Sequence, residues 1–153
     1  MAAWLVKSEP DVFSIDDLKR DKRTTWEGVR NYQARNFLRS MAVGDQLLYY
    51  HSNCEVPGVV GIARVVRTAY PDPTQFDPSS HYYDPTSKPE DPRWSLVDVG
   101  FSKKLRRTVS LTELKGHADE LGDFPLIRKG NRLSVLPVSD HQLAVVVDLA
   151  GRK

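Results

Sequence analysis

The sequence predicts a mixed α+β domain built on a small, mostly antiparallel sheet or partial barrel. Short runs of β-branched and aromatic residues recur at strand length along the chain. Helix-capping signals mark short helices between them, and no segment repeats. At 153 residues the chain is long enough to bury a core without disulfides. We therefore expect residues 1–153 to form one domain with five or six strands and no second core.

The first strand and the first helix are indicated by apolar content and by a cap. The run AAWLVKSE, residues 2–9, is apolar and then ends in polar residues, which is typical of a strand. In the following SIDDLKR, Ser14 and Asp17 have the spacing of a capping box. This predicts one or two helical turns over residues 14–20.

A longer helix is predicted to begin at Asn31, a residue type that caps helix N-termini well. The apolar residues that follow are spaced i, i+3, i+4 and i+7, as on one face of a helix. They are Ala34, Phe37, Leu38 and Met41. Gly44 and Asp45 end this helix after about three turns.

The middle of the chain predicts an antiparallel pair followed by a long loop. Residues 46–52 and 59–70 are rich in β-branched and aromatic side chains, and turn-forming residues separate them. Between Tyr70 and Pro92 the chain has six prolines, which exclude regular structure over most of that length. Loops of this length in compact domains are usually functional or partly mobile.

The remaining elements alternate between strands and capped helices. Residues 93–101, 103–111 and 132–138 have the composition of three further strands. A short helix is predicted to follow Ser110, because Glu113 completes a capping box with it. The segment 139–151 is ambiguous, since its valines favour a strand. The spacing of Ser139 and Gln142 and the terminal Gly151 favour a helix.

Composition restricts the class of protein. The net charge is +2 and the pI about 8.7, so attraction to nucleic acid requires a local site. The single cysteine, Cys54, excludes an intramolecular disulfide. The N-terminus has no basic start followed by a long apolar run, and no later segment is apolar enough for a membrane span. We expect a cytoplasmic protein, or a nuclear one in a eukaryotic host, without membrane contact.

No catalytic or metal-binding pattern is present. The chain lacks G-x-S-x-G, a phosphate-binding glycine loop and H-E-x-x-H. The acidic pair Asp16-Asp17 lies at a predicted helix start, where capping accounts for it. The four histidines are scattered, and a structural or solvent-exposed role is favoured for each: they are His51, His81, His117 and His141. We expect no cofactor and no metal.

The stretch TTWEGVRNYQARN, residues 24–36, is unusually rich in hydrogen-bonding side chains. A capping Asn31 and a solvated stripe of Arg35 and Arg39 account for part of it. Trp26, Gly28, Arg30 and Gln33 are left without a role. A tryptophan and a glycine beside a helix N-terminus can stack a planar heterocycle and read its edge. A buried structural tryptophan is the alternative.

Motifs along nearly the whole chain resemble the EVE domain family, which belongs to the PUA-like group. The motifs are KSEP at 7–10, WEGVRNYQARN at 26–36, GDQLLYYHS at 44–52, PGVVGIARV at 57–65, YYDP and PRW within 82–94, and RLSVLPVS at 132–139. The resemblance implies a PUA-like, mostly antiparallel β pseudo-barrel flanked by short helices. It also implies a non-enzymatic reader that binds DNA or RNA carrying a modified base, a cytosine or an adenine. We expect a monomer.

By position, the resemblance implies a pocket for one flipped base. Its residues would come from the end of the first strand, the entrance of the longer helix, the end of the second strand and the last strand. They are Lys7, Ser8, Glu9, Trp26, Val29, Arg30, Asn31, Gln33, His51, Ser52, Leu133 and Ser134. Trp26 would form the stacking wall.

Individual roles remain open. Ser8 and Ser52 are either base-edge donors or ordinary turn-forming residues. Lys7 and Arg30 suit phosphate, and either could pair with Glu9 instead. The aromatic residues of the proline-rich loop either pack it onto the barrel or line the groove; they are Tyr82, Tyr83 and Trp94. The alternatives to a reader are an enzyme acting on a modified nucleotide or base and an accessory protein with a small-ligand pocket.

Overall fold

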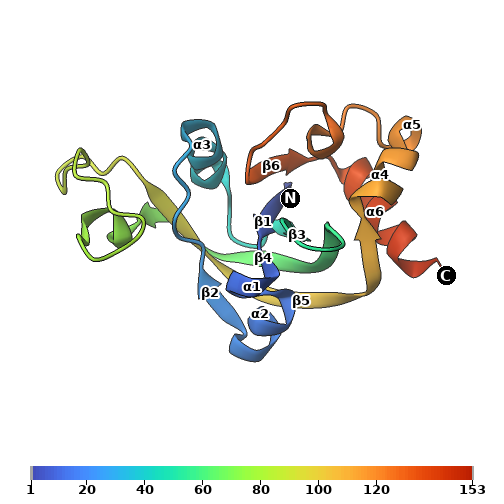
Figure 1. Cartoon of the computed structure of the whole chain (residues 1–153), viewed down its shortest axis with the longest axis horizontal. Helices are drawn as coiled ribbons and strands as arrows, with labels where there is room; N and C mark the ends of the chain where they lie inside the picture. The colour runs from blue at the N-terminus through green and yellow to red at the C-terminus, as the bar shows by residue number, and fades with distance from the viewer. Residues whose placement is uncertain (1, 153) are drawn as a thin grey trace.

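The computed structural model describes residues 2–152, and its framework is one six-stranded sheet with helices on both faces (Figure 1). The strand order is β2-β5-β4-β3-β1-β6. Strands β1 and β3 are parallel, and every other neighbouring pair is antiparallel. The strands are β1 (Ala3–Ser8), β2 (Arg23–Thr25), β3 (Gln46–His51), β4 (Gly58–Pro71), β5 (Ser95–Ser110) and β6 (Val135–Val138).

The helices are short and fall into two groups along the chain. The α-helices are α1 (Pro10–Phe13), α2 (Ile15–Asp21), α3 (Tyr32–Ser40), α4 (Leu111–Gly116), α5 (Ala118–Leu121) and α6 (Asp140–Gly151). Two 3-10 turns complete them, η1 (Pro73–Phe76) and η2 (Pro125–Ile127). Figure 1 shows α4, α5 and α6 together near the C-terminus, away from α1, α2 and α3. Within residues 2–152, no helix has the length and apolarity that a bilayer crossing requires.

Buried side chains form two hydrophobic clusters, one on each face of the same sheet. Trp4 and Leu47 lie in the cluster with α2 and α3, and their neighbours Leu5 and Leu48 lie in the cluster with α4 to α6. Successive side chains of a strand point to opposite faces of a sheet, and here helices cover both faces. Strands β1, β3, β4, β5 and β6 line both clusters, so the two share one sheet.

The two strands expected over residues 93–101 and 103–111 are a single strand, β5. The single residue between them, Ser102, does not form a turn. Instead, the register against β4 shifts: Phe101 pairs with Ala63 and Lys103 with Ile62, so Ser102 is an extra residue. Such a bulge bends a strand without ending it. Figure 1 shows β5 running along the molecule and then turning toward α4.

The capping signals in the sequence predicted the helix starts correctly. Ser14 and Asp17 form a capping box on α2, and Ser139 with Gln142 forms one on α6. The amide of Ala34 donates to the Asn31 side chain at 3.0 Å, so α3 begins where expected. The four-residue α1 and the three-residue β2 were not predicted, because so short a segment has no periodicity to read.

Buried polar groups hold the long loop between β4 and β5 in place. Gln75 is 0% exposed, and its side-chain amide donates to the carbonyls of Asp72 at 2.7 Å and Trp94 at 2.8 Å. Its carbonyl oxygen accepts from the Trp94 amide at 3.0 Å. Both ends of the loop are therefore fastened to one side chain. Apart from η1 and one isolated bridge the loop is irregular, as its prolines predicted.

Candidate functional site

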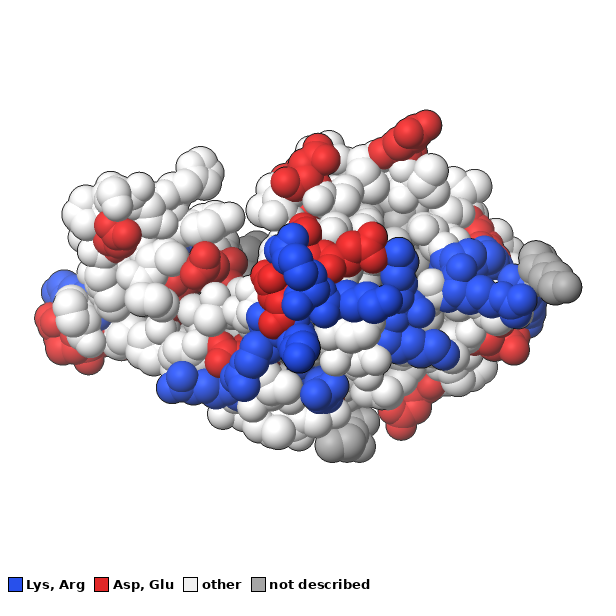
Figure 2. Space-filling view, turned by 90° about the horizontal axis from the view of Figure 1, so that it is seen from below, with Lys and Arg blue, Asp and Glu red and all other residues white. Residues whose placement is uncertain are grey.

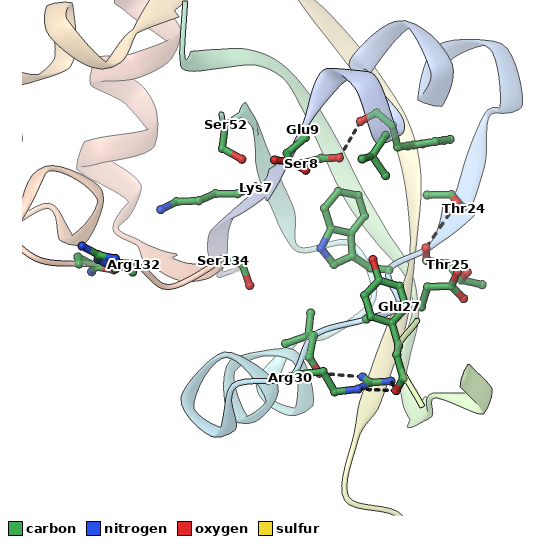
Figure 3. A pocket seen from close by; sticks show the side chains of 17 residues that line it. Lys7, Ser8, Glu9, Thr24, Thr25, Glu27, Arg30, Ser52, Arg132 and Ser134 are labelled. Atoms are coloured by element: carbon green, nitrogen blue, oxygen red, sulfur yellow. Dashed lines mark hydrogen bonds between the residues drawn. The ribbon is translucent and has the colours of Figure 1, made fainter. Parts of the chain in front are cut away.

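A cavity of about 770 Å³ opens where the ends of β1 and β3 meet the β2–α3 connection (Figure 3). Its volume falls in the range usual for ligand pockets. Because β1 and β3 are parallel, their C-terminal ends lie at the same edge of the sheet, and Ser8 pairs with His51 there. The segment before β6 closes one side, since the Lys7 amide donates to the Ser134 carbonyl at 3.0 Å.

The structure brings eight of the twelve predicted residues to this cavity. They are Lys7, Ser8, Glu9, Trp26, Val29, Arg30, Ser52 and Ser134. Further residues line it, among them Thr24, Thr25, Gly28, Tyr82 and Arg132. Gly28 was indicated by its place beside Trp26 in the polar stretch, and groove lining was one of the two alternatives for Tyr82. Thr24, Thr25 and Arg132 were not predicted.

The other four predicted residues lie outside the cavity lining. Asn31 caps α3, and Gln33 is exposed on that helix. Leu133 packs against the hydrophobic clusters. The His51 Nε2 atom accepts a hydrogen bond from the Ile15 amide at 3.1 Å, which requires an unprotonated nitrogen there. Desolvation by burial lowers the pKa of His51 below its ordinary value of 6.5.

Trp26 belongs both to the core and to the cavity. It is only 8% exposed, and its ring packs edge-on against Tyr49 with the ring centroids 5.5 Å apart. The structural alternative is therefore correct for most of the ring, and only a small part of the ring faces the cavity.

The indole N–H groups of Trp4 and Trp94 donate to Asp45 and Asp84. Within residues 2–152 the Trp26 N–H donates to no acceptor, and no fully buried side-chain nitrogen or oxygen is left unpaired. We infer that this N–H is available at the cavity surface.

Arg30 is fully engaged in holding the long loop against the cavity. Its five N–H groups donate to the carbonyls of Val29 and Tyr82, to the Thr74 hydroxyl and to the Asp72 carboxylate. Asp72 is 0% exposed and also accepts from the Gly28 amide at 2.9 Å. The alternative pairing of Arg30 with Glu9 is wrong, because Asp72 is its partner. No N–H of Arg30 remains for a phosphate in this conformation.

Lys7 is a half-buried ammonium without a carboxylate partner within 4.0 Å among the described residues. Its Nζ lies 5.8 Å from the centre of the Tyr50 ring. Desolvation by burial lowers the Lys7 pKa below its usual range. Figure 3 shows the amine pointing away from Ser8 and Glu9, toward the side on which Arg132 lies. A cation held in this way lacks a counter-charge that an anionic or electron-rich ligand can supply.

The serines of the cavity differ in what they offer. The Ser8 hydroxyl donates to the Phe13 carbonyl at 2.7 Å, so its turn-forming alternative is correct. The hydroxyls of Ser52 and Ser134 have no partner among residues 2–152, and Figure 3 shows both at the cavity. Glu9 accepts from the Asn53 side chain. The cavity thus presents the free hydroxyls of Ser52 and Ser134, the Lys7 ammonium and the Trp26 indole N–H to a ligand. The hydroxyls of Thr25 and Tyr82 and the guanidinium of Arg132 also line it without a partner among residues 2–152.

Metal binding finds no support in this geometry. Among residues 2–152, no three His, Cys, Asp or Glu side chains are grouped closely enough to hold an ion. The cavity lining has no histidine and two carboxylates, Glu9 and Glu27, and neither lies beside a nucleophile and base pair. Its chemistry suits hydrogen bonding to a planar polar ligand.

The fold and the cavity together define a PUA-like protein with a ligand site at one edge of its sheet. The sequence profile of the EVE domain matches residues 2–149. The chain therefore belongs to the EVE domain family, as its motifs implied.

Relatives of similar sequence and structure span nearly the whole chain. Thymocyte nuclear protein 1 of Gallus gallus is 45% identical over 98% of this chain and 69% of its own length, and that of Homo sapiens is 44% identical over 98% and 74%. A crystal structure of a protein from Pseudomonas syringae is 51% identical, covers 97% of this chain and 99% of that one, and has a TM-score of 0.94. The crystal structure of human THYN1 protein in complex with 5-methylcytosine containing DNA is 41% identical, with coverage of 100% and 99% and a TM-score of 0.95.

Proposed function

We propose that this protein is a nucleic-acid reader that accommodates one flipped, modified base in the cavity beside Trp26. One observation carries the proposal: the chain matches over its full length a human protein whose structure contains 5-methylcytosine DNA. The cavity supports it independently, because it is large enough to admit a base and presents unpaired polar groups that can bond to the base edge. A modified cytosine in DNA is the first ligand to test, and modified adenine and RNA follow.

The polar groups define how a cytosine would be held. The Trp26 N–H and the Lys7 ammonium can only donate, so they suit the ring nitrogen and carbonyl oxygen on the base edge. The hydroxyls of Ser52 and Ser134 can also accept, so they suit the exocyclic amine. The buried Val29 offers an apolar surface for a methyl group. Because Trp26 is mostly covered, the base would meet its edge, and the Tyr82 ring would supply a second wall.

The same geometry favours binding over catalysis. Turnover of a base requires a general acid or base placed over the ring together with a nucleophile or an activated water. Glu9 is bonded to Asn53, and Glu27 is exposed at the rim. We propose that the chain acts as a monomeric, single-domain, non-enzymatic reader. It would work in the nucleus of a eukaryotic host, as the name of its relatives suggests, or in the cytoplasm of a bacterial one.

The test is a titration of labelled oligonucleotides that differ only at one central base. Cytosine, modified cytosines, adenine and modified adenines would be compared in DNA and in RNA at one fixed salt concentration. Discrimination by one base contact amounts to about 1–3 kcal/mol, so the preferred oligonucleotide should bind roughly 5- to 150-fold more tightly. Equal affinity for modified and unmodified strands throughout the series would exclude the reader function.

A matched pair of variants connects the affinity to the cavity. Ser134→Ala removes a free hydroxyl from the lining, and Ser102→Ala removes one from the exposed bulge of β5. The first should weaken binding of the preferred oligonucleotide by about 0.5–1.5 kcal/mol, whereas the second should leave it unchanged. Equal effects would place the base elsewhere.

A further inference from the structure

A second hollow, of about 430 Å³, lies between α3 and the loop segment 86–93. Four basic side chains line it, and they face a single carboxylate. Arg35 and Arg39 come from α3, Lys88 and Arg93 from the loop, and Asp91 is the acidic residue. The hollow therefore has a positive charge that the net charge of the whole chain, only +2, does not reveal.

The arginines of this hollow are held by neutral groups. Arg35 donates to the Arg93 carbonyl at 3.0 Å, Arg39 to the Ser95 hydroxyl at 3.0 Å, and Arg93 to the Tyr32 hydroxyl at 3.2 Å. Among residues 2–152, none of the three lies within 4.0 Å of a carboxylate, Asp91 included. Each also keeps N–H groups that donate to nothing, in contrast to the fully used Arg30. These guanidinium groups are free to bind an anion.

The positive charge on the underside of the molecule is of another kind. Figure 2 shows many Lys and Arg side chains there, with Asp and Glu among them. Lys104 pairs with Asp16 at 2.8 Å, and Arg23 pairs with Asp98 at 3.1 Å. Ion pairs of this kind neutralise part of that charge within the protein. Lys103 and Arg106 of β5 are also without a carboxylate within 4.0 Å among residues 2–152, so the lack of an ion pair does not by itself distinguish the hollow. The hollow beside α3 is the better candidate for an anion site because its four cations line one concave surface.

A ladder of stacked groups joins this hollow to the base cavity. The Arg30 guanidinium lies 5.6 Å from the Tyr82 ring and 5.5 Å from the Trp94 ring. Trp94 stacks on Tyr32 at 5.0 Å, and Arg35 lies 4.9 Å from the Tyr32 ring. Tyr82 lines the first cavity, and Arg35 lines the second. The two sites are thus parts of one packed unit formed by α3 and the long loop.

We propose that this hollow binds backbone phosphates of the same nucleic-acid strand whose flipped base occupies the cavity. The inference rests on the proposed function. Contacts to phosphates add affinity that does not depend on the base sequence, and the hollow would make these contacts. The planar guanidinium fork matches the oxygens of a phosphodiester, which is why arginine is common at such sites. A flipped base leaves its own strand beside the cavity mouth, and the adjacent hollow supplies the cations that Arg30 cannot.

The electrostatic surroundings of Arg35 agree with an anion site. Its pKa is lowered, first by desolvation and then by the nearby charges of Arg39 and Arg93. Like charges held together without a counterion favour the binding of an anion.

The test compares two double variants that remove equal charge. Lys88→Gln/Arg93→Gln removes two of the four positive charges of the hollow and leaves the side chains of Arg35 and Arg39, which bond to the loop carbonyls, unchanged. Lys103→Gln/Arg106→Gln removes two exposed charges from β5 and serves as the matched control. Affinities for a modified oligonucleotide and its unmodified counterpart are measured over a series of salt concentrations.

The hollow variant should lower the affinity for both oligonucleotides by the same factor. Its slope of log affinity against log salt should fall by about 0.7–0.9 for each phosphate that the variant no longer neutralises. The ratio between modified and unmodified affinity should stay at the wild-type value, and the control should keep the wild-type slope. Arg93→Lys retains the charge and should keep most of the slope, which separates removal of charge from damage to the loop.

Each outcome has one meaning. If the hollow variant has the same slope and affinity as the control, phosphates do not bind there, and the inference is overturned. If wild type binds both oligonucleotides equally but the hollow variant still has a reduced slope, the base-reading function fails and the phosphate site stands. If wild type binds no oligonucleotide, both are overturned.

Discussion

Gly28 is the residue whose replacement tests the construction of the cavity most directly. Its φ is +86°, a backbone conformation that residues with a side chain rarely adopt. A Cβ atom at this position would lie 2.5 Å from Cζ of Tyr82, well inside van der Waals contact. The backbone cannot retreat easily, because the Gly28 amide donates to the buried Asp72 carboxylate at 2.9 Å. Gly28→Ala must therefore displace the Tyr82 ring or break that bond.

The expected cost has two parts. A left-handed conformation costs an alanine about 1–2 kcal/mol relative to glycine. Forcing extra volume into a packed contact adds about 1–3 kcal/mol. Tyr82 cannot move freely, since its ring packs on Arg30 and its carbonyl accepts two of the Arg30 N–H groups. Gly28→Ala should thus lower the free energy of unfolding by about 2–5 kcal/mol.

Gly130→Ala is the matched control. Gly130 has a φ of +80°, and a Cβ there would have no neighbour within 4 Å. It should lose only the backbone part, about 1–2 kcal/mol. Urea unfolding of both variants, with the slope m checked for constancy, gives the comparison. If the two variants lose the same stability, the contact between Gly28 and Tyr82 is not restrictive and the reasoning is refuted.

A double variant tests whether the Tyr82 ring causes the additional loss of stability in Gly28→Ala. Tyr82→Ala removes the ring that the new Cβ meets, so adding it to Gly28→Ala should recover about 1–3 kcal/mol relative to additivity. Gly28→Ala should also weaken binding of the preferred oligonucleotide, because Tyr82 lines the cavity. Strict additivity of the two stability changes would contradict the steric explanation.

Three further predictions follow from single groups of the site. Trp26→Ala should lose about 3–5 kcal/mol of stability, because the ring is mostly covered and only 8% exposed. Trp26→Phe should keep most of the wild-type stability but lose about 0.5–1.5 kcal/mol of binding free energy, because it lacks the indole N–H. Wild-type affinity in Trp26→Phe would exclude a contact between this N–H and the base. Lys7→Met should raise the melting temperature, because it removes a desolvated charge. The same variant should weaken oligonucleotide binding by about 1.5–3 kcal/mol. Unchanged affinity in a titration would exclude Lys7 from the site. Because folding lowers the His51 pKa, the unfolded chain takes up a proton before the folded chain does, and the free energy of unfolding should fall as the pH drops below 6.5. In urea unfolding at pH about 7 and about 5.5, His51→Gln should lose less stability between the two pH values than wild type. An identical pH dependence in both proteins would contradict the role of His51.

Much of the local structure is determined by the sequence alone. Capping side chains act within one turn of the backbone that they bond, so Ser14, Asn31 and Ser139 predicted where α2, α3 and α6 begin. The prolines between Tyr70 and Pro92 exclude a regular element whatever the surroundings. The motifs also predicted most of the cavity lining. Lys7 lies near the end of β1, Ser52 follows β3 and Ser134 precedes β6, and these strand ends meet at one edge of the sheet.

The tertiary structure decided what depends on residues far apart in the chain. Ser102 is a bulge and not a turn only because β4 continues to pair on both sides of it. Arg30 is a brace and not a phosphate ligand because Asp72, 42 positions away, is buried beside it. Trp26 is mostly buried because residues of other strands contact it. The Tyr49 ring packs against its ring, and the Val97 carbonyl accepts from its backbone amide. A side chain's type fixes which bonds it can make, but the packing of distant segments fixes which of them remain free for a ligand.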